Sequence, residues 1–463
     1  MNWLRITQVL VIGYSAASRT FAYLGIAQLK IFLGEVVLGW FLLRKQRAFG
    51  WFLLSPPKSP YVEMLRISLV AFVLYGLVSL LLGHFNNPHN TLQAFQNFAF
   101  NYYALYLVIG IWVGARYRLQ MPKFAMAFGW IHGVYGTLWI LLLNRLPLEL
   151  PGSGGVDLFG QPTGAAAAVL MLFAYERRLG RIALPALLNI FVMVGVQVRA
   201  EWLGFLVGVC VWAFLARRMS QLVAMGMLGA MLLAIGLFFD VRFQGVSGRG
   251  GEVSVQGVVG RMLAPFDPHL AGKFVEDAEG LGGTAEWRQK WWREIWMTVN
   301  EGPPVILLFG HGYGWGITDV VGYVEEGIRT PHCIFFYALG YGGWCGVLVF
   351  VFFQGTLAWC LFRAYKLTGQ AFGITFWTLG MIMALLGNQL ETPFGAIQFY
   401  LLAGMTLKPL YVSREFWEEW RRPRYAGFGR YFAVAPHRHA QPAEAWEPTP
   451  AEVPASYRER LGL

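Results

Sequence analysis

The stretch PHCIFFYALGYGGWCGVLVFVFF, residues 331–353, decides the class of fold. It has no charged residue, and a helix of this length crosses a hydrocarbon core of about 30 Å. Similar apolar runs recur on both sides of it, and the chain is 56% hydrophobic and 14% charged, whereas a soluble globular protein is about 25% charged. Because the runs do not alternate in polarity as outer-membrane strands do, we expect an all-α polytopic membrane protein.

We expect about twelve transmembrane helices of the usual length. Their predicted ranges are 6–27, 30–43, 65–83, 98–114, 124–143, 162–175, 182–198, 201–215, 222–239, 333–353, 372–390 and 396–412. The first is expected to be retained rather than cleaved, since Arg19 follows its small residues. The chain then divides into spans 1–239, a long loop 240–331, spans 332–412 and a tail 413–463, part of which is expected to be disordered.

Basic residues predict the orientation. Lys and Arg gather in the short loops on one side of the predicted spans and in the tail, whereas loops 84–96 and 144–161 between them contain only Arg145. By the positive-inside rule the first side is cytoplasmic, as are both termini, and loop 240–331 lies in the periplasm. We therefore expect a bacterial inner-membrane protein, whose net charge of +11 does not indicate a nucleic-acid partner.

The long loop has two unlike halves. The first is rich in glycine and contains several arginines, and we expect it to be irregular. The second contains a predicted amphipathic helix over 284–300, with an apolar stripe formed by Trp287, Trp291, Ile295 and Val299. Because tryptophan favours the membrane interface, we expect this helix to lie there.

Three residues on the predicted outer face are the main candidates for chemistry. Arg199 ends a span, and its planar guanidinium suits phosphate oxygens; the alternatives are an ion pair with Glu201 or an interfacial anchor. Arg288 lies among tryptophans, either as a second phosphate-binding cation or as a surface cation. His332 precedes a span, where the helix dipole favours a neutral imidazole that accepts protons; the alternative is an interfacial His bonded to a loop carbonyl.

Other loop residues are weaker candidates. Arg329 and Arg293 are further cations of the same kind as Arg288. His311 and Tyr313 belong to the Gly-rich stretch 310–316, which lacks the preceding strand and following helix of a dinucleotide-binding motif. For His311 we expect a positional role, and for the stretch a flexible turn, with backbone contacts to an anion as the alternative.

The sequence offers no positive sign of a metal or cofactor. It contains no HExxH or Walker A motif and no cluster of carboxylates on the predicted outer face. The four cysteines include no CxxC pair, and we expect them to be packed thiols.

Two spaced motifs resemble those of the O-antigen ligase and O-antigen polymerase superfamily of bacterial membrane glycosyltransferases. The segment Arg199-Ala200-Glu201-Trp202-Leu203 fits the Arg-x-x-x-Leu motif of the ligases. His332-Cys333, nine residues and then Gly343-Trp344-Cys345-Gly346 fit their second motif, although Cys333 replaces the usual Asn, Ser or Gln. The layout of spans, the long outer loop and Glu391-Thr392-Pro393-Phe394 add to the resemblance.

The resemblance implies transfer of a glycan from an undecaprenyl-diphosphate carrier to an acceptor hydroxyl, with inversion and without a metal or cofactor. It implies His332 as general base and Arg199 and Arg288 as diphosphate-binding residues. Further substrate contacts are predicted at Arg329, His311, Trp287 and Tyr313. We expect membrane lipids around the spans and the lipid A core as acceptor; the alternatives are a second lipid-linked glycan, as in a polymerase, and a protein, as in an O-oligosaccharyltransferase.

The rival from another class is a transporter or flippase of lipid-linked sugars. Such proteins usually contain ionisable residues or broken helices near mid-membrane in both halves of an internal repeat. Here Glu35 and Arg19 are the main charges inside the predicted spans, and the sequence shows no repeat. The pattern therefore favours an enzyme.

Overall fold

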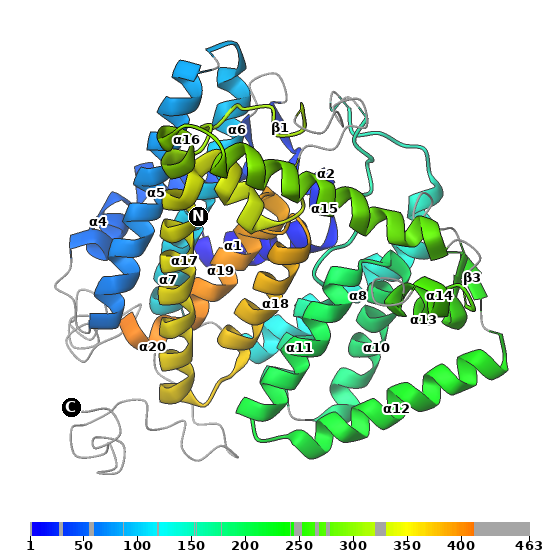
Figure 1. The fold of residues 1–463 in the computed structure, drawn as a ribbon. Helices are drawn as coiled ribbons and strands as arrows, with labels where there is room; N and C mark the ends of the chain where they lie inside the picture. Colours follow the sequence, from blue (N-terminus) through cyan, green and yellow to red (C-terminus); the bar gives the residue numbers. More distant parts are fainter. Residues whose placement is uncertain are drawn as a thin grey trace, which may run out of the picture.

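The computed structural model describes residues 2–411 apart from 27–30, 55–59, 87, 118–119, 152, 154, 177, 241, 245–251, 264–267, 275–277 and 320–329. The predicted tail 413–463 lies outside the described residues. Within them the chain is mostly helical, with two short antiparallel hairpins (Figure 1). The predicted all-α class is confirmed.

The first half of the chain runs from α1 to α12. Its elements are α1 (Trp3–Ala16), α2 (Ser18–Ala22), β1 (Gly25–Ile26), β2 (Ile31–Phe32), α3 (Leu33–Arg44), α4 (Gln46–Leu54), α5 (Pro60–Asn86), η2 (Pro88–Asn90), α6 (Thr91–Tyr102), η3 (Tyr103–Leu105), α7 (Tyr106–Arg116), α8 (Met121–Leu141), η4 (Leu143–Arg145), α9 (Ala165–Tyr175), α10 (Leu179–Val196), α11 (Arg199–Leu215) and α12 (Met219–Phe238).

The second half begins with the long loop and returns to apolar helices. Its elements are β3 (Arg242–Gln244), β4 (Glu252–Ser254), α13 (Val255–Leu263), α14 (Pro268–Ala271), α15 (Ala278–Asn300), α16 (Pro304–Phe309), α17 (Ile334–Thr368), α18 (Phe372–Leu386), α19 (Pro393–Thr406) and α20 (Lys408–Tyr411).

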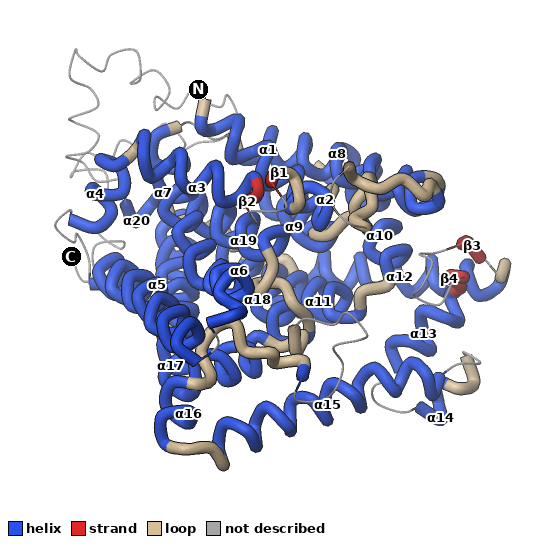
Figure 2. Tube along the Cα trace, turned by 90° about the horizontal axis from the view of Figure 1, so that it is seen from above, coloured by secondary structure: helices blue, strands red, loops and turns tan. Residues whose placement is uncertain are grey.

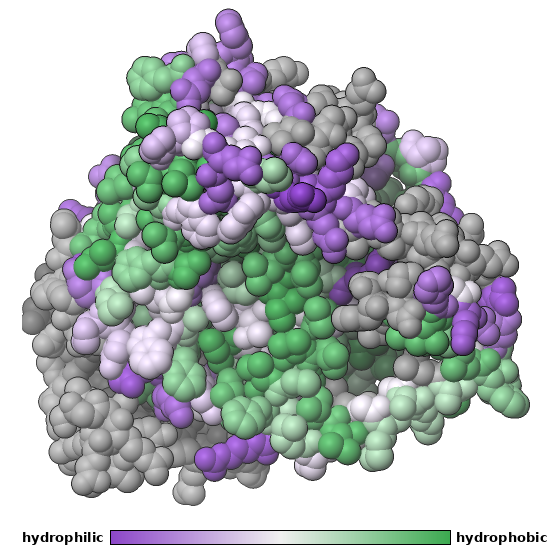
Figure 3. Space-filling model, in the orientation of Figure 1, coloured by the Kyte–Doolittle hydropathy of each residue, from purple (hydrophilic) through white to green (hydrophobic). Residues whose placement is uncertain are grey.

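Several helices have the length and composition of membrane spans. Among the described residues there are five, namely Pro60–Asn86, Pro88–Arg116, Met121–Leu141, Leu179–Val196 and Ile334–Thr368. Shorter apolar helices are Ala165–Tyr175, Gly229–Phe238 and Phe372–Leu386. In Figure 3 hydrophobic residues form a broad belt across one face, with hydrophilic residues gathered above it over α15. These features indicate a membrane protein.

The core centres on α19 and the helix packed against it, α7. Every residue of α19 from Gly395 to Met405 is buried. The two backbones approach so closely that a Cβ on Gly110 would lie 2.4 Å from the Leu401 carbonyl oxygen. Small residues allow such close contacts between helices in membranes. The tight pair fixes the position of the segment that leads into α19.

The first predicted span, 6–27, is not one helix. The chain turns after α1, where Ser18 has a φ of +40°. The loop before α9 packs into this turn, and the Thr163 N–H donates to the Ser15 carbonyl at 2.7 Å. The Ser15 carbonyl thus accepts a hydrogen bond from the loop instead of from the next turn of a continuous helix. After this turn, β1 and β2 lead into α3.

Helix α17 is longer than the predicted span 333–353 and is broken within it. Gly343 has φ +58° and ψ −162°, outside the helical region. The turn after α16 packs into the break, where the His311 N–H donates to the Gly340 carbonyl at 3.0 Å. A Cβ on Gly310 would lie 2.5 Å from the Gly343 nitrogen. Glycine at both positions lets the two backbones touch.

The predicted amphipathic helix 284–300 is confirmed as the C-terminal part of α15. Its apolar stripe faces inward, since Trp291, Ile295 and Val299 are each 0% exposed. Trp292 on the adjoining face stacks on Phe336 of α17 at 5.3 Å between ring centroids. Figure 1 shows α15 crosswise to the upright α17, α18 and α11, and Figure 2 shows it along one edge of the molecule.

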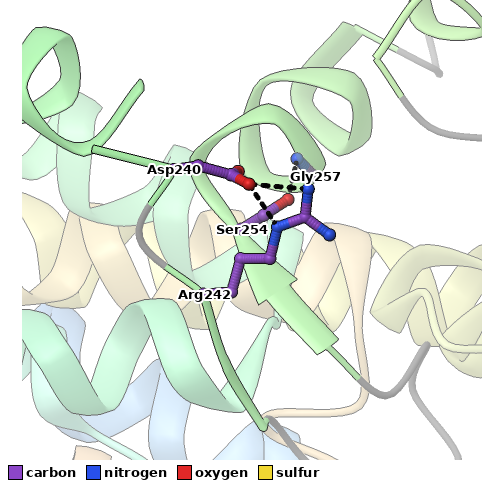
Figure 4. Close-up of polar contacts among 4 residues, drawn as sticks. All are labelled: Asp240, Arg242, Ser254 and Gly257. Carbon is purple, nitrogen blue, oxygen red and sulfur yellow. Dashed lines mark hydrogen bonds and ion pairs between the residues drawn. The ribbon is translucent and has the colours of Figure 1, made fainter. Parts of the chain in front are cut away.

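The Gly-rich half of the long loop contains regular structure, contrary to the prediction. β3 pairs with β4 in antiparallel register, with Arg242 opposite Ser254. In Figure 4 the Asp240 carboxylate accepts a hydrogen bond from Arg242 at 2.8 Å, and the Ser254 hydroxyl accepts one from the Gly257 N–H at 2.9 Å. The second bond caps the first turn of α13 and so helps to position Arg261 on that helix.

Candidate active site

Arg199 is placed by the sharp junction between α10 and α11. Gln197 ends α10 in the left-handed region, with a φ of +60°, and α11 starts at Arg199. The Glu201 carboxylate accepts a hydrogen bond from the Ala166 N–H at 3.0 Å and ties α11 to the start of α9. Burial lowers the pKa of the Arg199 guanidinium. The cation therefore lies at the positive end of a helix, where an anion is favoured.

Arg288 extends from α15 toward the end of α18. Its guanidinium carbon lies 5.5 Å from the centroid of the Trp287 ring, and Nη1 donates to the Leu386 carbonyl at 3.4 Å. Its Nε is buried and has no hydrogen-bond partner among the described residues. Arg288 therefore retains a buried donor that a bound group could use.

His332 is held in an uncommon backbone conformation. Its φ is +52°, and the next residue, Cys333, is the N-cap of α17. The Trp292 indole N–H donates to the Pro331 carbonyl at 2.7 Å, which fixes the preceding residue. A non-glycine residue in this region costs of order 1–3 kcal/mol, and such residues cluster at functional sites. The predicted position of His332, just before a helix, is confirmed.

Trp287 contacts both Arg288 and His332. Its ring centroid is 6.1 Å from that of His332, with the rings nearly perpendicular at 79°. The Arg288 guanidinium carbon lies 5.5 Å from the centroid of the same ring. One tryptophan thus positions both the candidate cation and the candidate base.

Arg199 lies close enough to two other guanidinium groups for its charge to affect their ionisation. Burial, and then the charge of Arg199, lowers the pKa of Arg288. The same two causes lower the pKa of Arg261. We call Arg199, Arg261 and Arg288 the arginine cluster. A bound anion would reduce the repulsion between Arg199 and each of the other two, and planar guanidinium groups are well suited to bind one.

Arg261 is the member that sequence reasoning did not single out. It is only 7% exposed and lies on α13, within the half of the loop that was predicted to be irregular. A signal was available, since Ser254 and the apolar residues after it form a capped helix. The glycines before the helix, and Gly257 and Gly260 within it, concealed it.

The Gly-rich turn has a packing role. Tyr313 is 4% exposed, and its hydroxyl donates to the Asn101 side chain. The His311 ring stacks on Trp315 at 3.9 Å between centroids, burial lowers its pKa, and its Nε2 has no partner among the described residues. A Cβ on Gly83 of α5 would lie 1.6 Å from the Tyr313 carbonyl oxygen. The turn joins α5 to α17.

The predicted site residues therefore fall into two groups. The first group is drawn from α11, α15 and the segment just before α17, and consists of Arg199, Arg288, Trp287 and His332. His311 and Tyr313 lie in the packed turn, and Arg329 lies outside the described residues.

No protein-family model matches the sequence, and no curated protein matches it either.

Proposed function

We propose that the protein is a membrane glycosyltransferase that moves a glycan from undecaprenyl diphosphate to an acceptor hydroxyl. The observation that carries the proposal is the approach of the arginine cluster to His332. Arg199 influences Arg288 electrostatically, and Trp287 contacts both Arg288 and His332. These residues belong to segments that are distant in the sequence. An anion-binding group beside a candidate base is the arrangement that such a transfer requires.

In the proposed reaction the acceptor oxygen attacks the anomeric carbon while His332 takes its proton. The bond between that carbon and the phosphate oxygen breaks, and the electron pair leaves with undecaprenyl diphosphate. The arginine cluster stabilises the charge that develops on the leaving diphosphate. Attack from the side opposite the leaving group inverts the anomeric centre. The reaction thus needs no metal, because guanidinium groups supply the positive charge.

The cluster is proposed to lie on the periplasmic face of the bacterial inner membrane. The alternation of basic and neutral loops along the twelve predicted ranges supports this orientation. With both termini in the cytoplasm, Arg199, α15 and His332 all fall on the opposite side. The undecaprenyl chain would lie among the apolar helices, with its diphosphate at the level of α15.

The proposed acceptor is the lipid A core, as in an O-antigen ligase. A purified reaction in nanodiscs tests this, with labelled undecaprenyl-diphosphate oligosaccharide and EDTA, with and without lipid A core. Transfer that depends on the core supports the ligase. A ladder of longer lipid-linked glycans without the core would show a polymerase instead, and no transfer to any acceptor would overturn the proposal.

A further inference from the structure

A large cavity opens beside the segment that carries His332. Its volume is about 1100 Å³, and it is lined by the start of α3, by α6, by residues after the Gly-rich turn and by Thr330, Tyr337, Glu391 and Pro393. Thr330 is two residues before His332. Pockets that enclose a drug-sized ligand measure roughly 300–1,000 Å³. The cavity therefore has room for more than one sugar ring.

The lining has one kind of charge. Among the described residues that line the cavity there is no Lys, Arg or His, and the ionisable acids are Glu35, Asp319 and Glu391. Amide side chains of η2 and α6, namely Asn90, Gln93, Gln96 and Asn97, add further hydrogen-bonding groups. Aromatic side chains complete the walls, and Phe95 among them is 53% exposed. Such a lining disfavours an anion and suits the hydroxyl groups and apolar faces of sugars.

Glu391 has hydrogen-bonding capacity that the protein does not use. Both carboxyl oxygens are buried, and neither has a hydrogen-bond partner of good geometry among the described residues. The Thr330 hydroxyl is nevertheless close enough to stabilise the ionised carboxylate and so to lower its pKa against the larger effect of burial. Glu35 differs, since it accepts bonds from the Phe32 N–H at 3.0 Å and from the Tyr102 hydroxyl at 2.9 Å. A buried polar group without a partner is unusual, and here it lines the cavity.

The protonation state of Glu391 fits a neutral ligand. Burial raises the pKa of this carboxyl to about 8, so it is mostly protonated at pH 7. A protonated carboxyl both donates and accepts hydrogen bonds, as a sugar hydroxyl does.

Cys333, the residue after His332, links the cavity to Arg288. The Cys333 thiol lies within electrostatic range of Glu391 and of Arg288, whose effects on its ionisation are opposite. Cys333 is therefore near both the acidic cavity and the cationic cluster. The two sites are adjacent but differ in charge, which suits two substrates of different chemistry.

We propose that this cavity is the acceptor subsite, and that Glu391 binds the hydroxyl groups of an uncharged sugar at the end of the acceptor glycan. The inference rests on the proposed function. It assigns the diphosphate of the donor to the arginine cluster and excludes phosphorylated or carboxylated sugars from the cavity. The acceptor hydroxyl is then presented to His332 from the side of Thr330.

Two measurements test the subsite. The first compares steady-state transfer to lipid A core by wild type, Glu391→Ala, Glu391→Gln and Phe95→Ala in nanodiscs. We expect Glu391→Ala and Phe95→Ala to raise the KM for the acceptor about tenfold or more, with the donor KM unchanged. Glu391→Gln, which mimics the protonated carboxyl, recovers most of the loss. Glu301→Gln, at an exposed carboxylate after α15, is the matched control and leaves both constants unchanged.

The second measurement does not depend on catalysis. Saturation-transfer NMR compares the binding of maltotriose and of maltotriose 1-phosphate to the same proteins. We expect the neutral sugar to bind wild type and to lose its signal with Glu391→Ala, and the phosphorylated sugar to bind at least tenfold more weakly.

The outcomes separate the two proposals. If transfer occurs but Glu391→Ala and Phe95→Ala leave the acceptor KM unchanged or raise the donor KM instead, the subsite is wrong and the proposed function stands. If no transfer is found while maltotriose binding requires Glu391, the cavity binds sugars and the proposed function is wrong. Equal binding of both probes by wild type would also refute the subsite.

Discussion

Arg288→Gln is predicted to slow glycan transfer by about 10²–10³-fold while leaving the protein folded. The side chain makes few contacts that stabilise the empty protein. Its contact with Trp287 at 5.5 Å is a cation–π interaction, which contributes about 0.5–1 kcal/mol at exposed sites. Its bond to the Leu386 carbonyl, at 3.4 Å, is long and adds less than a typical hydrogen bond of about 1 kcal/mol. Loss of its repulsion with Arg199 offsets part of this cost, so we expect a net change within about 1 kcal/mol.

The catalytic effect is expected to be much larger. Removing one preorganised group that stabilises a developing charge costs about 10²–10³ in kcat, or about 2.7–4 kcal/mol. Arg288→Lys keeps the charge but loses the planar fork, so its transfer rate should fall between those of wild type and Arg288→Gln. Arg293→Gln is the matched control, because Arg293 is exposed on the same helix and its loss should change neither rate nor stability.

The assay combines initial rates of transfer in nanodiscs with melting temperatures from intrinsic fluorescence, for which the tryptophans of α15 are suitable probes. We expect a large loss of rate with a nearly constant melting temperature. This expectation would be refuted if Arg288→Gln retained transfer within threefold of wild type. A melting temperature that fell in parallel with the rate would instead make Arg288 a structural residue.

Three further predictions concern other parts of the molecule. His332→Gly is expected to change the free energy of unfolding by no more than about 1 kcal/mol, because glycine accepts the positive φ. The rate of transfer should fall about 10²–10⁴-fold through loss of the base. Unchanged transfer would exclude His332 as the base, and His269→Gly on α14 is the control. Because burial raises the pKa of Glu391 from 4.5 to about 8, the carboxyl contributes its full stability below about pH 4.5 and loses it as the pH rises through 8. The melting temperature of wild type should therefore fall between pH 5 and 8, and that of Glu391→Gln should fall less. An identical fall in both proteins would contradict this. Gly310→Ala places a Cβ 2.5 Å from the Gly343 nitrogen at a φ of +69°, so it should destabilise the protein by about 2 kcal/mol or more. Gly369→Ala also has a positive φ but lies in open space, so it should cost only the free energy of the unfavourable backbone conformation. Equal melting temperatures for the two variants would count against the packed turn.

The elements with a strong periodic pattern were predictable. The stripe of Trp291, Ile295 and Val299 predicted a helix with one buried face, and all three residues are buried in α15. The uncharged run after His332 likewise predicted the helix that starts at Ile334. In both cases the pattern reflects a local cause, namely which face of a helix is removed from water.

Features that depend on contacts between distant segments were not predictable. The break in α17 was not predicted, because it arises where the turn at Gly310 meets Gly343. The helix carrying Arg261 was concealed by the glycines before and within it. The cavity near Glu391 was not foreseen, since its walls come from parts of the chain that are far apart in the sequence. Where the sequence has no periodic pattern, a residue's contacts depend on distant segments, and they become known only from the structure.

The most direct test of the central claim counts both products of one reaction. Purified protein in nanodiscs is given labelled undecaprenyl-diphosphate oligosaccharide, lipid A core and EDTA, and the glycan gained by the core is compared with the undecaprenyl diphosphate released. The account predicts one molecule released for each glycan transferred, with inverted configuration at the new bond, and neither product with His332→Gly. Intact lipid-linked oligosaccharide that crosses the bilayer of a proteoliposome without any transfer would contradict the account and identify a transporter.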